Sequence, residues 1–369
     1  MTQAEHYMQR ALDLAAQGEG RTRPNPPVGA LVVLQGRVIG EGFHQRAGEA
    51  HAEIIALRQA GENSRGADLY VTLEPCSHQG RTGPCADAVI AAGIRRVFIG
   101  CRDPNPQVAG RGVARLVDAG IEVVEGILDA QCRWLIGPFS RHITTGQPLV
   151  TLKAAISLDG RTATAQGDSQ WISNPESRGH VHEIRDRVDA IMVGIGTALR
   201  DDPSLTTRLA RGGRDAVRVV VDSRLRLPED AKLLHLDSDA PTVIATTEQA
   251  SYGKIRKLRD LGARVLVLPA KQERVDLGAL LTALGGMDLQ HLLLEGGADL
   301  NGAFLRERLI DRVLVYIAPR LIGGDGKALF DGVGAPTLSK AASLANLRLR
   351  RFGDDLCYEG EVRYVHGPD

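Results

Sequence analysis

The sequence is poor in aromatic residues, has no excess of charge and contains no long apolar run. Aromatic side chains make up 4% of the 369 residues, and 45 Lys and Arg residues balance 45 Asp and Glu residues. A chain without net charge or an aromatic-rich basic face has little general attraction for nucleic acid or anionic membranes. Apolar runs such as residues 31–34 are far shorter than a membrane-spanning helix, and the N-terminus lacks a signal-peptide pattern. We therefore expect a cytoplasmic protein that binds neither nucleic acid nor membrane.

Cysteine is scarce, and its count is odd. The five cysteines are Cys76, Cys85, Cys101, Cys132 and Cys357. An odd number in a long chain without a secretion signal argues against a disulfide framework and fits a metalloenzyme of a reducing compartment. We expect the last three to be ordinary core or surface thiols.

The length predicts two α/β domains, with a boundary near residue 145. In residues 1–145, a helix over 5–17 precedes a hairpin over 28–42 and an alternation of helices and strands. The order from residue 28 is strand, strand, helix, strand, helix, strand, helix, strand, which predicts a mixed sheet covered by helices. Residues 130–145 are expected to form a helix or linker that leads out of this domain.

A second α/β pattern fills residues 146–369. Strands are expected over 149–156, 190–193, 217–221, 242–245, 265–268, 291–294 and 313–318, with helices over 251–261, 277–284 and 298–306. Two strand-like pieces, at 347–352 and 356–364, close the chain.

A metal site is predicted in the N-terminal domain from His51, Cys76 and Cys85, with Glu53 two residues after the histidine. One imidazole and two thiolates leave a fourth zinc position free for water, as in catalytic zinc sites. Zinc lowers the pKa of that water. A carboxylate that is not a ligand can then move the proton from the water to a leaving amine, as in zinc deaminases. Glu53 is the candidate for this role.

The spacing of the two cysteines requires a loop between them. They are nine residues apart, which in a continuous helix is about 13.5 Å along the axis, too far to share one ion. Gly80, Gly83 and Pro84 permit such a loop, and Cys85 is expected to open a helix over 85–92. The alternative is a structural zinc knot with His44 or His78 as fourth ligand, in which Glu53 would have no purpose.

The motifs together resemble a known family over essentially the whole chain. Those before residue 86 are Asn25-Pro26-Pro27-Val28-Gly29, Gly42-Phe43-His44, His51-Ala52-Glu53, Glu74-Pro75-Cys76-Ser77-His78 and Gly80-Arg81-Thr82 up to Cys85. Those beyond are Lys153, Ser157-Leu158-Asp159-Gly160-Arg161, Ser169-Gln170-Trp171-Ile172, Asp201-Asp202-Pro203, Leu205-Thr206, Asp222-Ser223, Glu295-Gly296-Gly297 and Leu321-Ile322-Gly323-Gly324. The chain resembles the bifunctional riboflavin-biosynthesis deaminase/reductases, in which a diaminohydroxyphosphoribosylaminopyrimidine deaminase is fused to a 5-amino-6-(5-phosphoribosylamino)uracil reductase.

The resemblance implies a cytidine-deaminase-like domain over 1–145, followed by a dihydrofolate-reductase-like domain over 146–369. The first would remove an exocyclic amine from 2,5-diamino-6-(5-phosphoribosylamino)pyrimidin-4-one, with Asn25 and His44 contacting base or sugar. Arg81 either meets the phosphate or is simply solvated. The second would transfer hydride from NADPH to the ribosyl carbon and yield the ribityl side chain.

The resemblance also implies the reductase site residues. Lys153 and Asp201 are the polar groups expected near hydride transfer. Substrate contacts are expected from Ser169, Arg185, Leu205, Arg208 and Glu295, and cofactor contacts from Ala155, Trp171, Thr197, Asp201, Ser223 and Gly297. Arginine binds phosphate bidentately, which suits Arg185 and Arg208, whereas Trp171 fits a core position equally well.

Glycine pattern alone supports a nucleotide site only weakly. Residues 193–199 follow a strand but lack the third glycine of a dinucleotide fingerprint. Gly296 and Gly297 follow another strand and open a helix, whose first amides can bind phosphate. A second pair, Gly323 and Gly324, follows a further strand. Arg224 and Arg226 are candidates for reading a ribose 2′-phosphate by charge and position alone.

Two other functions remain open from the sequence. One is a nucleobase or nucleoside zinc deaminase with an unrelated C-terminal domain, and the other is a non-enzymatic scaffold stabilised by zinc. We also expect a homodimer or higher homo-oligomer formed through the reductase domain.

Overall fold

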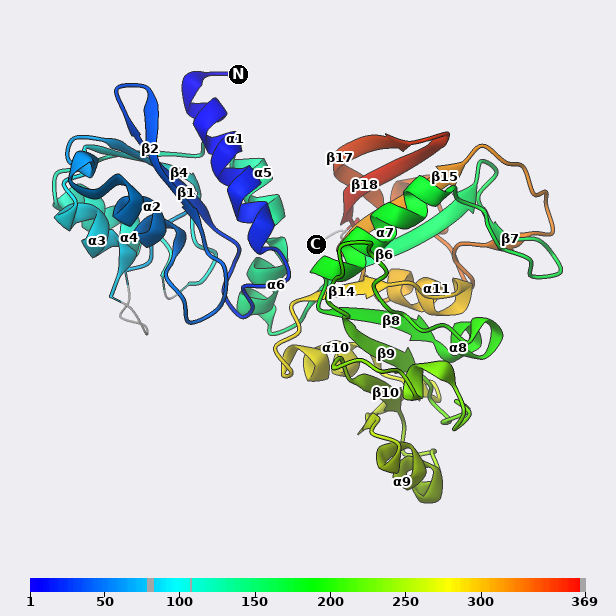
Figure 1. The fold of residues 1–369 in the computed structure, drawn as a ribbon. Helices are drawn as coiled ribbons and strands as arrows, with labels where there is room; N and C mark the ends of the chain where they lie inside the picture. The colour runs from blue at the N-terminus through cyan, green and yellow to red at the C-terminus, as the bar shows by residue number, and fades with distance from the viewer. Residues whose placement is uncertain (78–82, 107, 366–369) are drawn as a thin grey trace. The chain divides into compact units, whose positions relative to one another are not determined.

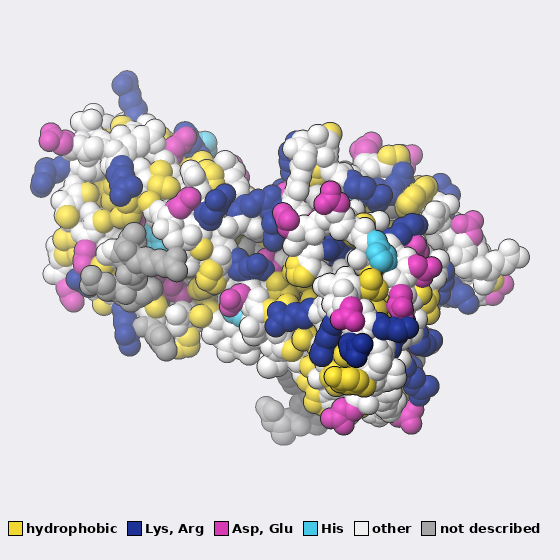
Figure 2. All heavy atoms as spheres, turned by 60° about the horizontal axis from the view of Figure 1, so that its bottom comes forward, with side chains coloured by type: hydrophobic (Ala, Val, Ile, Leu, Met, Phe, Trp, Pro, Cys, Tyr) yellow, Lys and Arg dark blue, Asp and Glu magenta, His cyan; other side chains and the backbone are white. Residues whose placement is uncertain are grey.

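The computed structural model describes residues 1–77, 83–106 and 108–365 (Figure 1). The chain divides into two compact units, Met1–Gln147 and Pro148–Asp369, here called the first and second units. Within the described residues, no helix is both long and apolar enough to cross a membrane. On the face drawn in Figure 2, basic and acidic side chains are interspersed over both units.

The first unit is built on a mixed five-stranded sheet in the order β2-β1-β3-β4-β5. Its strands are β1 (Gly29–Leu34), β2 (Arg37–Phe43), β3 (Asp68–Leu73), β4 (Arg96–Cys101) and β5 (Glu122–Glu125). β1 runs antiparallel to both β2 and β3, whereas β3, β4 and β5 are parallel. Gln35 and Gly36 both have positive φ, at 48° and 77°, which is the backbone of a two-residue hairpin turn.

Helices cover both faces of this sheet (Figure 1). They are α1 (Gln3–Ala15), α2 (Ala52–Ala60), α3 (Cys85–Ala91), α4 (Arg111–Asp118), α5 (Asp129–Leu135) and α6 (Gly137–Thr145), with short 3₁₀ turns at Ala16–Gly18 and Gly61–Ser64. Successive strand residues point to opposite faces, so Ala30 and Val32 pack with α2, α3 and α4, while Leu31 and Val33 pack with α1 and α5. Gly40 lets α2 lie close to the hairpin, because a Cβ there would be 2.1 Å from the Ala56 carbonyl oxygen.

The second unit is built on a nine-stranded sheet in the order β11-β10-β9-β8-β14-β6-β15-β18-β17. Its strands are β6 (Leu149–Ser157), β8 (Ala190–Gly194), β9 (Val217–Val221), β10 (Thr242–Thr246), β11 (Arg264–Val267), β14 (His291–Leu294), β15 (Arg312–Ala318), β17 (Ser343–Phe352) and β18 (Asp355–Arg363). The strands from β11 to β15 are parallel, and β18 and β17 extend the sheet antiparallel.

Helices also cover both faces of the second sheet. They are α7 (Pro175–Arg187), α8 (Ile195–Asp201), α9 (Tyr252–Asp260), α10 (Leu277–Gly285) and α11 (Ala298–Arg306). One core contains α10 and α11, and the other contains α8 and α9. Shorter elements are β7 (Arg161–Ala163), β12 (Ala270–Lys271), β13 (Arg274–Val275), β16 (Lys327–Ala328) and 3₁₀ turns at Lys232–Leu234 and Leu338–Lys340.

Each strand and helix expected from the sequence has a counterpart, with residues 130–145 forming the two helices α5 and α6, whereas α7 and the short α8 are additions. The sequence of α7 is strongly polar, and its few buried residues include Ser177 and His180, so it lacks the apolar periodicity that predicts a helix. A start signal is nevertheless present. Asn174 caps the helix by accepting a hydrogen bond from the Ser177 N–H, and Pro175 is the first helical residue.

Candidate active sites

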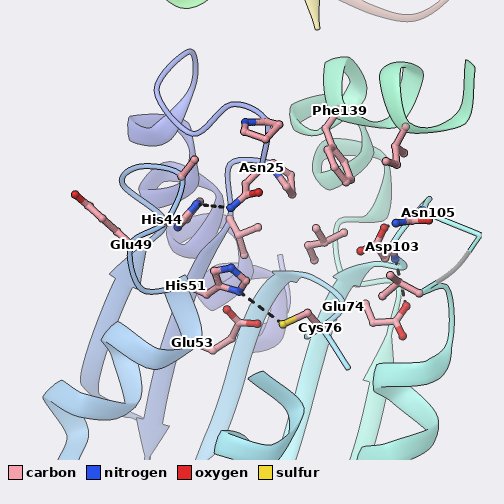
Figure 3. Close-up of a pocket in the computed structure, with 18 residues that line it drawn as sticks. Asn25, His44, Glu49, His51, Glu53, Glu74, Cys76, Asp103, Asn105 and Phe139 are labelled. Carbon is pink, nitrogen blue, oxygen red and sulfur yellow. Dashed lines mark hydrogen bonds between the residues drawn. The ribbon is translucent and has the colours of Figure 1, made fainter. Parts of the chain in front are cut away.

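Three predicted ligands converge in the first unit. His51 lies at the N-terminal cap of α2, Cys85 is the first residue of α3, and Cys76 follows the end of β3. His51 Nδ1 is 3.2 Å from Cys85 Sγ and 3.7 Å from Cys76 Sγ. The Cys85 N–H donates to Cys76 Sγ at 3.3 Å, so the chain folds back between the cysteines as their spacing requires. Figure 3 shows His51 and Cys76 side by side at the base of a pocket.

The geometry of these ligands fits a zinc ion. Zinc bonds of 2.0–2.3 Å in a tetrahedron place neighbouring ligand atoms roughly 3.3–3.8 Å apart, and the atoms here all lie within 4.8 Å of one another. The neighbouring Cys85 thiol lowers the pKa of Cys76 to about 4, and Cys76 in turn raises the pKa of Cys85. One of the two sulfurs therefore ionises readily at the point where a cation would be held by both.

The described residues supply three ligands to this cluster, not four. His44, one of the two alternatives for a closed zinc knot, has both ring nitrogens engaged elsewhere. Its Nδ1 is 3.1 Å from the Ala50 carbonyl oxygen, and its Nε2 is 3.0 Å from Asn25 Nδ2. The other alternative, His78, lies outside the described residues, as does Arg81. An open fourth position is typical of a catalytic zinc site.

Glu53 lies in the first turn of α2, beside the ligands but outside their cluster. Glu53 is only 3% exposed, and it lines the pocket at whose base His51 and Cys76 lie. Burial, and next the negative charge of Cys76, raise the pKa of Glu53 to about 7. A carboxyl group with a pKa near neutrality can both accept and return a proton, which is the property required of a general acid–base.

The pocket above the ligands has a volume of about 460 Å³. Burial lowers the pKa of His44, so this histidine is neutral and donates from Nδ1 to Ala50 while its Nε2 accepts from the Asn25 amide. The bond fixes which end of the amide carries the oxygen. In Figure 3, Asn25 lies between His44 and the open part of the pocket.

The opposite wall of the pocket is formed by residues that sequence reasoning missed. Asp103 and Asn105 follow the end of β4, and Phe139 comes from α6 (Figure 3). The first two stand just beyond the carboxyl end of a parallel strand, where ligands of open α/β sheets bind, and this position was the available signal. Glu74, between β3 and Cys76, belongs to a motif of the family resemblance, which implies no role for it.

In the second unit, the structure joins three predicted residues into one ion network. Arg185 from α7 donates to both carboxylate oxygens of Glu295 at 2.8 and 3.0 Å, and Lys153 Nζ from β6 is 3.6 Å from Glu295 Oε2. Burial alone would raise the pKa of Glu295, but the charges of Arg185 and Lys153 lower it to about 2. Glu295 follows the last residue of β14, at the carboxyl edge of the parallel strands.

Two predicted cofactor residues lie together at the start of α11. Gly297 is its N-cap and has no side chain to satisfy the first amides of the helix. A Cβ on Gly297 would be 3.2 Å from Thr197 Oγ1, so the Thr197 hydroxyl faces this helix start. A helix N-terminus with an adjacent hydroxyl can bind a phosphate.

The remaining residues predicted for the reductase site do not form one cluster, and each has different neighbours. Trp171 is 58% exposed and carries the Arg178 guanidinium 4.6 Å from its ring centroid, so its interpretation as a core residue is wrong. Asp201 ends α8 and is exposed, and Ser169 is exposed. Ser223 Oγ accepts from the Val275 N–H. The others are Ala155, partly buried in β6, Leu205, buried with φ of 53°, and Arg208, whose N–H donates to His182 Nδ1.

A histidine and two cysteines around a shared point, with a buried acid beside them, define a metal-dependent deaminase joined to a second α/β domain. The family description "cytidine and deoxycytidylate deaminase zinc-binding region" matches residues 1–101, and "RibD C-terminal domain" matches residues 148–358. Riboflavin biosynthesis protein RibD of Actinobacillus pleuropneumoniae is 44% identical over 95% of this chain and 93% of its own length, and that of Escherichia coli is 42% identical over 96% and 98%.

Solved structures agree with these relatives. Acinetobacter baumannii RibD has a TM-score of 0.84 at 39% identity, covering 98% of this chain and 99% of its own. A Thermotoga maritima diaminohydroxyphosphoribosylaminopyrimidine deaminase/5-amino-6-(5-phosphoribosylamino)uracil reductase has a TM-score of 0.83 at 35% identity, with the same coverage. The chain belongs to the RibD family of riboflavin biosynthesis proteins and is a bifunctional deaminase and reductase.

The family confirms the predicted fold class, a cytidine-deaminase-like domain followed by an α/β reductase domain. A deaminase with an unrelated C-terminal domain is not favoured, because the C-terminal match spans most of the second unit. The deaminase match supports zinc, and the reductase domain implies a nicotinamide cofactor.

Proposed function

We propose that residues 1–145 deaminate 2,5-diamino-6-(5-phosphoribosylamino)pyrimidin-4-one and that residues 146–369 reduce its product with NADPH. The observation that carries the first step is the convergence of His51, Cys76 and Cys85 at the base of a 460 Å³ pocket with Glu53 beside them. The pocket volume suits a single heterocycle with part of its sugar. The named activities of the Thermotoga maritima relative support the substrates of both steps.

In the deaminase, each role follows from position and protonation. His51, Cys76 and Cys85 would hold zinc, which would supply a water acidified toward neutral pH. Glu53 takes a proton from the attacking water and returns it to the departing amine. Asn25, oriented by His44, hydrogen-bonds the pyrimidine and holds it over the ligands. Arg81 is proposed to meet the phosphate.

In the reductase, the ion network binds the substrate, and the N-terminus of α11 binds the cofactor. Glu295, Arg185 and Lys153 hold the substrate, together with Ser169, Leu205 and Arg208, and Lys153 and Asp201 lie nearest the transferred hydride. Thr197 and Gly297 bind a phosphate of the dinucleotide, with Ala155, Trp171, Asp201 and Ser223 as further contacts. NADPH is supported over NADH by the exposed Arg224 and Arg226 that follow β9, since arginine at this position accommodates a 2′-phosphate.

The test is to supply the phosphoribosylated diaminopyrimidinone with zinc and NADPH and to follow both products. We expect ammonia release first and NADPH oxidation second. Removing zinc with a chelator is expected to stop the first step and to leave reduction of pre-deaminated substrate unchanged. Deaminated product that is never reduced in excess NADPH would contradict the second assignment, and zinc-independent deamination would contradict the first.

We also propose a cytoplasmic location, which is supported by five free cysteines, and a homo-oligomer formed through the second unit. Strand β17 is the edge of the nine-stranded sheet and carries Leu347 and Leu349, which are 53% and 57% exposed. An exposed apolar edge strand favours pairing with another chain.

Replacing Leu347 and Leu349 together by Asp is therefore expected to convert the protein into single 39.6 kDa chains in light scattering after gel filtration. The matched control is Leu338→Asp, at a 93% exposed leucine of the same unit outside the sheet, which is expected to leave the oligomer intact. A wild-type protein that already elutes as one chain would rule out this interface.

A further inference from the structure

The carboxylate of Glu74 accepts four backbone hydrogen bonds from one distant segment. Oε2 accepts from the N–H groups of Asp103 at 3.2 Å and Gly110 at 3.0 Å. Oε1 accepts from those of Gly112 at 2.9 Å and Val113 at 3.2 Å. Glu74 is 3% exposed. Because hydrogen bonds to a buried carboxylate are stronger than those between neutral groups, they attach the end of β3 firmly to the backbone of these four residues.

The four amides include both ends of a pocket wall. Asp103 begins and Gly110 ends the segment whose members Asp103, Asn105 and Val108 line the pocket. Asp103 Oδ1 in turn accepts from the Asn105 N–H at 2.8 Å. Glu74 therefore fixes Asp103 directly and Asn105 through Asp103.

The same carboxylate fixes the start of α4 against the backbone that leads to Cys76. The amides of Gly112 and Val113 belong to the first turn of α4, whose N-cap, Gly110, has no side chain to cap them. A Cβ on Gly112 would lie 2.0 Å from the Pro75 carbonyl oxygen, so the helix start rests directly on the residue before the ligand. Glu74 therefore fixes the position of the pocket wall relative to the metal ligand Cys76.

We infer that Glu74 is a positioning residue of the deaminase, which sets the distance between the pocket wall formed by Asp103, Asn105 and Val108 and the ligand Cys76. Glu74 itself lines the pocket, but both of its carboxylate oxygens are engaged by backbone amides, so it acts through the loop that it holds. The inference rests on the proposed deaminase function. It predicts that loosening the loop weakens substrate binding more than it slows the chemical step.

The experiment compares Glu74→Gln and Glu74→Ala with wild type in the full-length zinc-loaded protein. Gln keeps one acceptor oxygen but turns a donor toward the other pair of amides, whereas Ala removes all four acceptors. We expect KM for deamination to rise about tenfold in Glu74→Gln and about 100-fold in Glu74→Ala, with kcat reduced only a few-fold. Hydrogen exchange is expected to accelerate at residues 103–113.

Three controls separate this role from a general loss of structure. Zinc content and reduction of pre-deaminated substrate report whether the variant is folded. Asp68→Asn, at the other end of β3, breaks a different buried carboxylate anchor, to Arg95 and Arg96, and is expected to leave KM unchanged. Wild-type KM and wild-type exchange at 103–113 in a zinc-replete Glu74→Gln variant would overturn the inference. If Glu74→Ala loses zinc, the Glu74→Gln values decide. A wild-type protein that does not deaminate would instead overturn the proposed function.

Discussion

Glu53→Gln is expected to reduce deaminase turnover about 10²–10⁴-fold, the usual contribution of a general acid–base. The amide has the shape of the carboxyl group but can neither take a proton from water nor give one to the leaving amine. Zinc content is expected to stay at the wild-type level, because Glu53 is not one of the three residues whose ligand atoms converge. Steady-state ammonia release and metal analysis of the same preparation measure both effects.

The matched control for this variant is Glu49→Gln. Glu49 lines the same pocket but is exposed at its edge (Figure 3), so its amide variant is expected to turn over within a few-fold of wild type. Reduction of pre-deaminated substrate is expected to be normal in both variants, since Lys153 and Glu295 lie in the second unit. Turnover by Glu53→Gln equal to that of Glu49→Gln would remove Glu53 from the mechanism.

The metal cluster was predictable because its ligands are residue types that commonly bind metal ions. Histidine and cysteine are the side chains that bind zinc most often, and helix geometry alone shows that Cys76 and Cys85, nine residues apart, need a loop between them to share an ion. Two backbone contacts close that loop: the N–H groups of Cys85 and Ala86 reach back to the sulfur and the carbonyl oxygen of Cys76.

The role of Glu74 was not predictable, because none of its partners is near it in the sequence. The four amides it holds are 29 to 39 residues further along the chain. Backbone N–H groups carry no residue identity, so no spacing of residue types marks them. The parallel pairing of β3 with β4 brings these amides to Glu74, and sequence periodicity predicts the strands but not which of them pair.

The contacts within the reductase ion network were likewise not predictable from the sequence. Lys153, Arg185 and Glu295 are each expected from the family resemblance to serve in binding or catalysis, but no sequence pattern indicates that they bind one another. They lie on β6, on the unexpected helix α7 and after β14. Without α7, nothing in the sequence indicates that Arg185 reaches the buried Glu295 carboxylate.

Glu295→Gln is expected to destabilise the second unit by about 3 kcal/mol and to reduce reductase kcat/KM about 100-fold. The substitution leaves Arg185 and Lys153, whose side chains are 13% and 19% exposed, without their shared anion. Removing one partner of a buried ion pair typically costs 3–5 kcal/mol, and a small displacement of binding groups can cost about 100-fold in rate. Calorimetry and NADPH oxidation measure the two effects, with deamination expected to be unchanged.

The matched control is Glu273→Gln, which breaks the ion pair to Arg224 at 3.0 Å. Both of those side chains are well exposed, at 72% and 63%. Exposed pairs contribute roughly 0–1 kcal/mol, so this variant is expected to unfold almost as wild type does. Equal destabilisation by Glu273→Gln and Glu295→Gln would mean that the network at Glu295 has no special weight in the fold.

The same network predicts how the second unit responds to acid. The ordinary pKa of a glutamate is 4.5, and in the fold the pKa of Glu295 is about 2. A carboxylate whose pKa is depressed by folding stabilises the protein fully above its unfolded pKa, and this stabilisation is lost as pH falls toward the folded pKa. Wild type should therefore lose stability from about pH 4.5 down to about pH 2. Glu295→Gln has no proton to gain at this position, so its unfolding temperature is expected to fall less over that interval, and equal slopes for the two proteins would show that Glu295 is not held ionised by its partners.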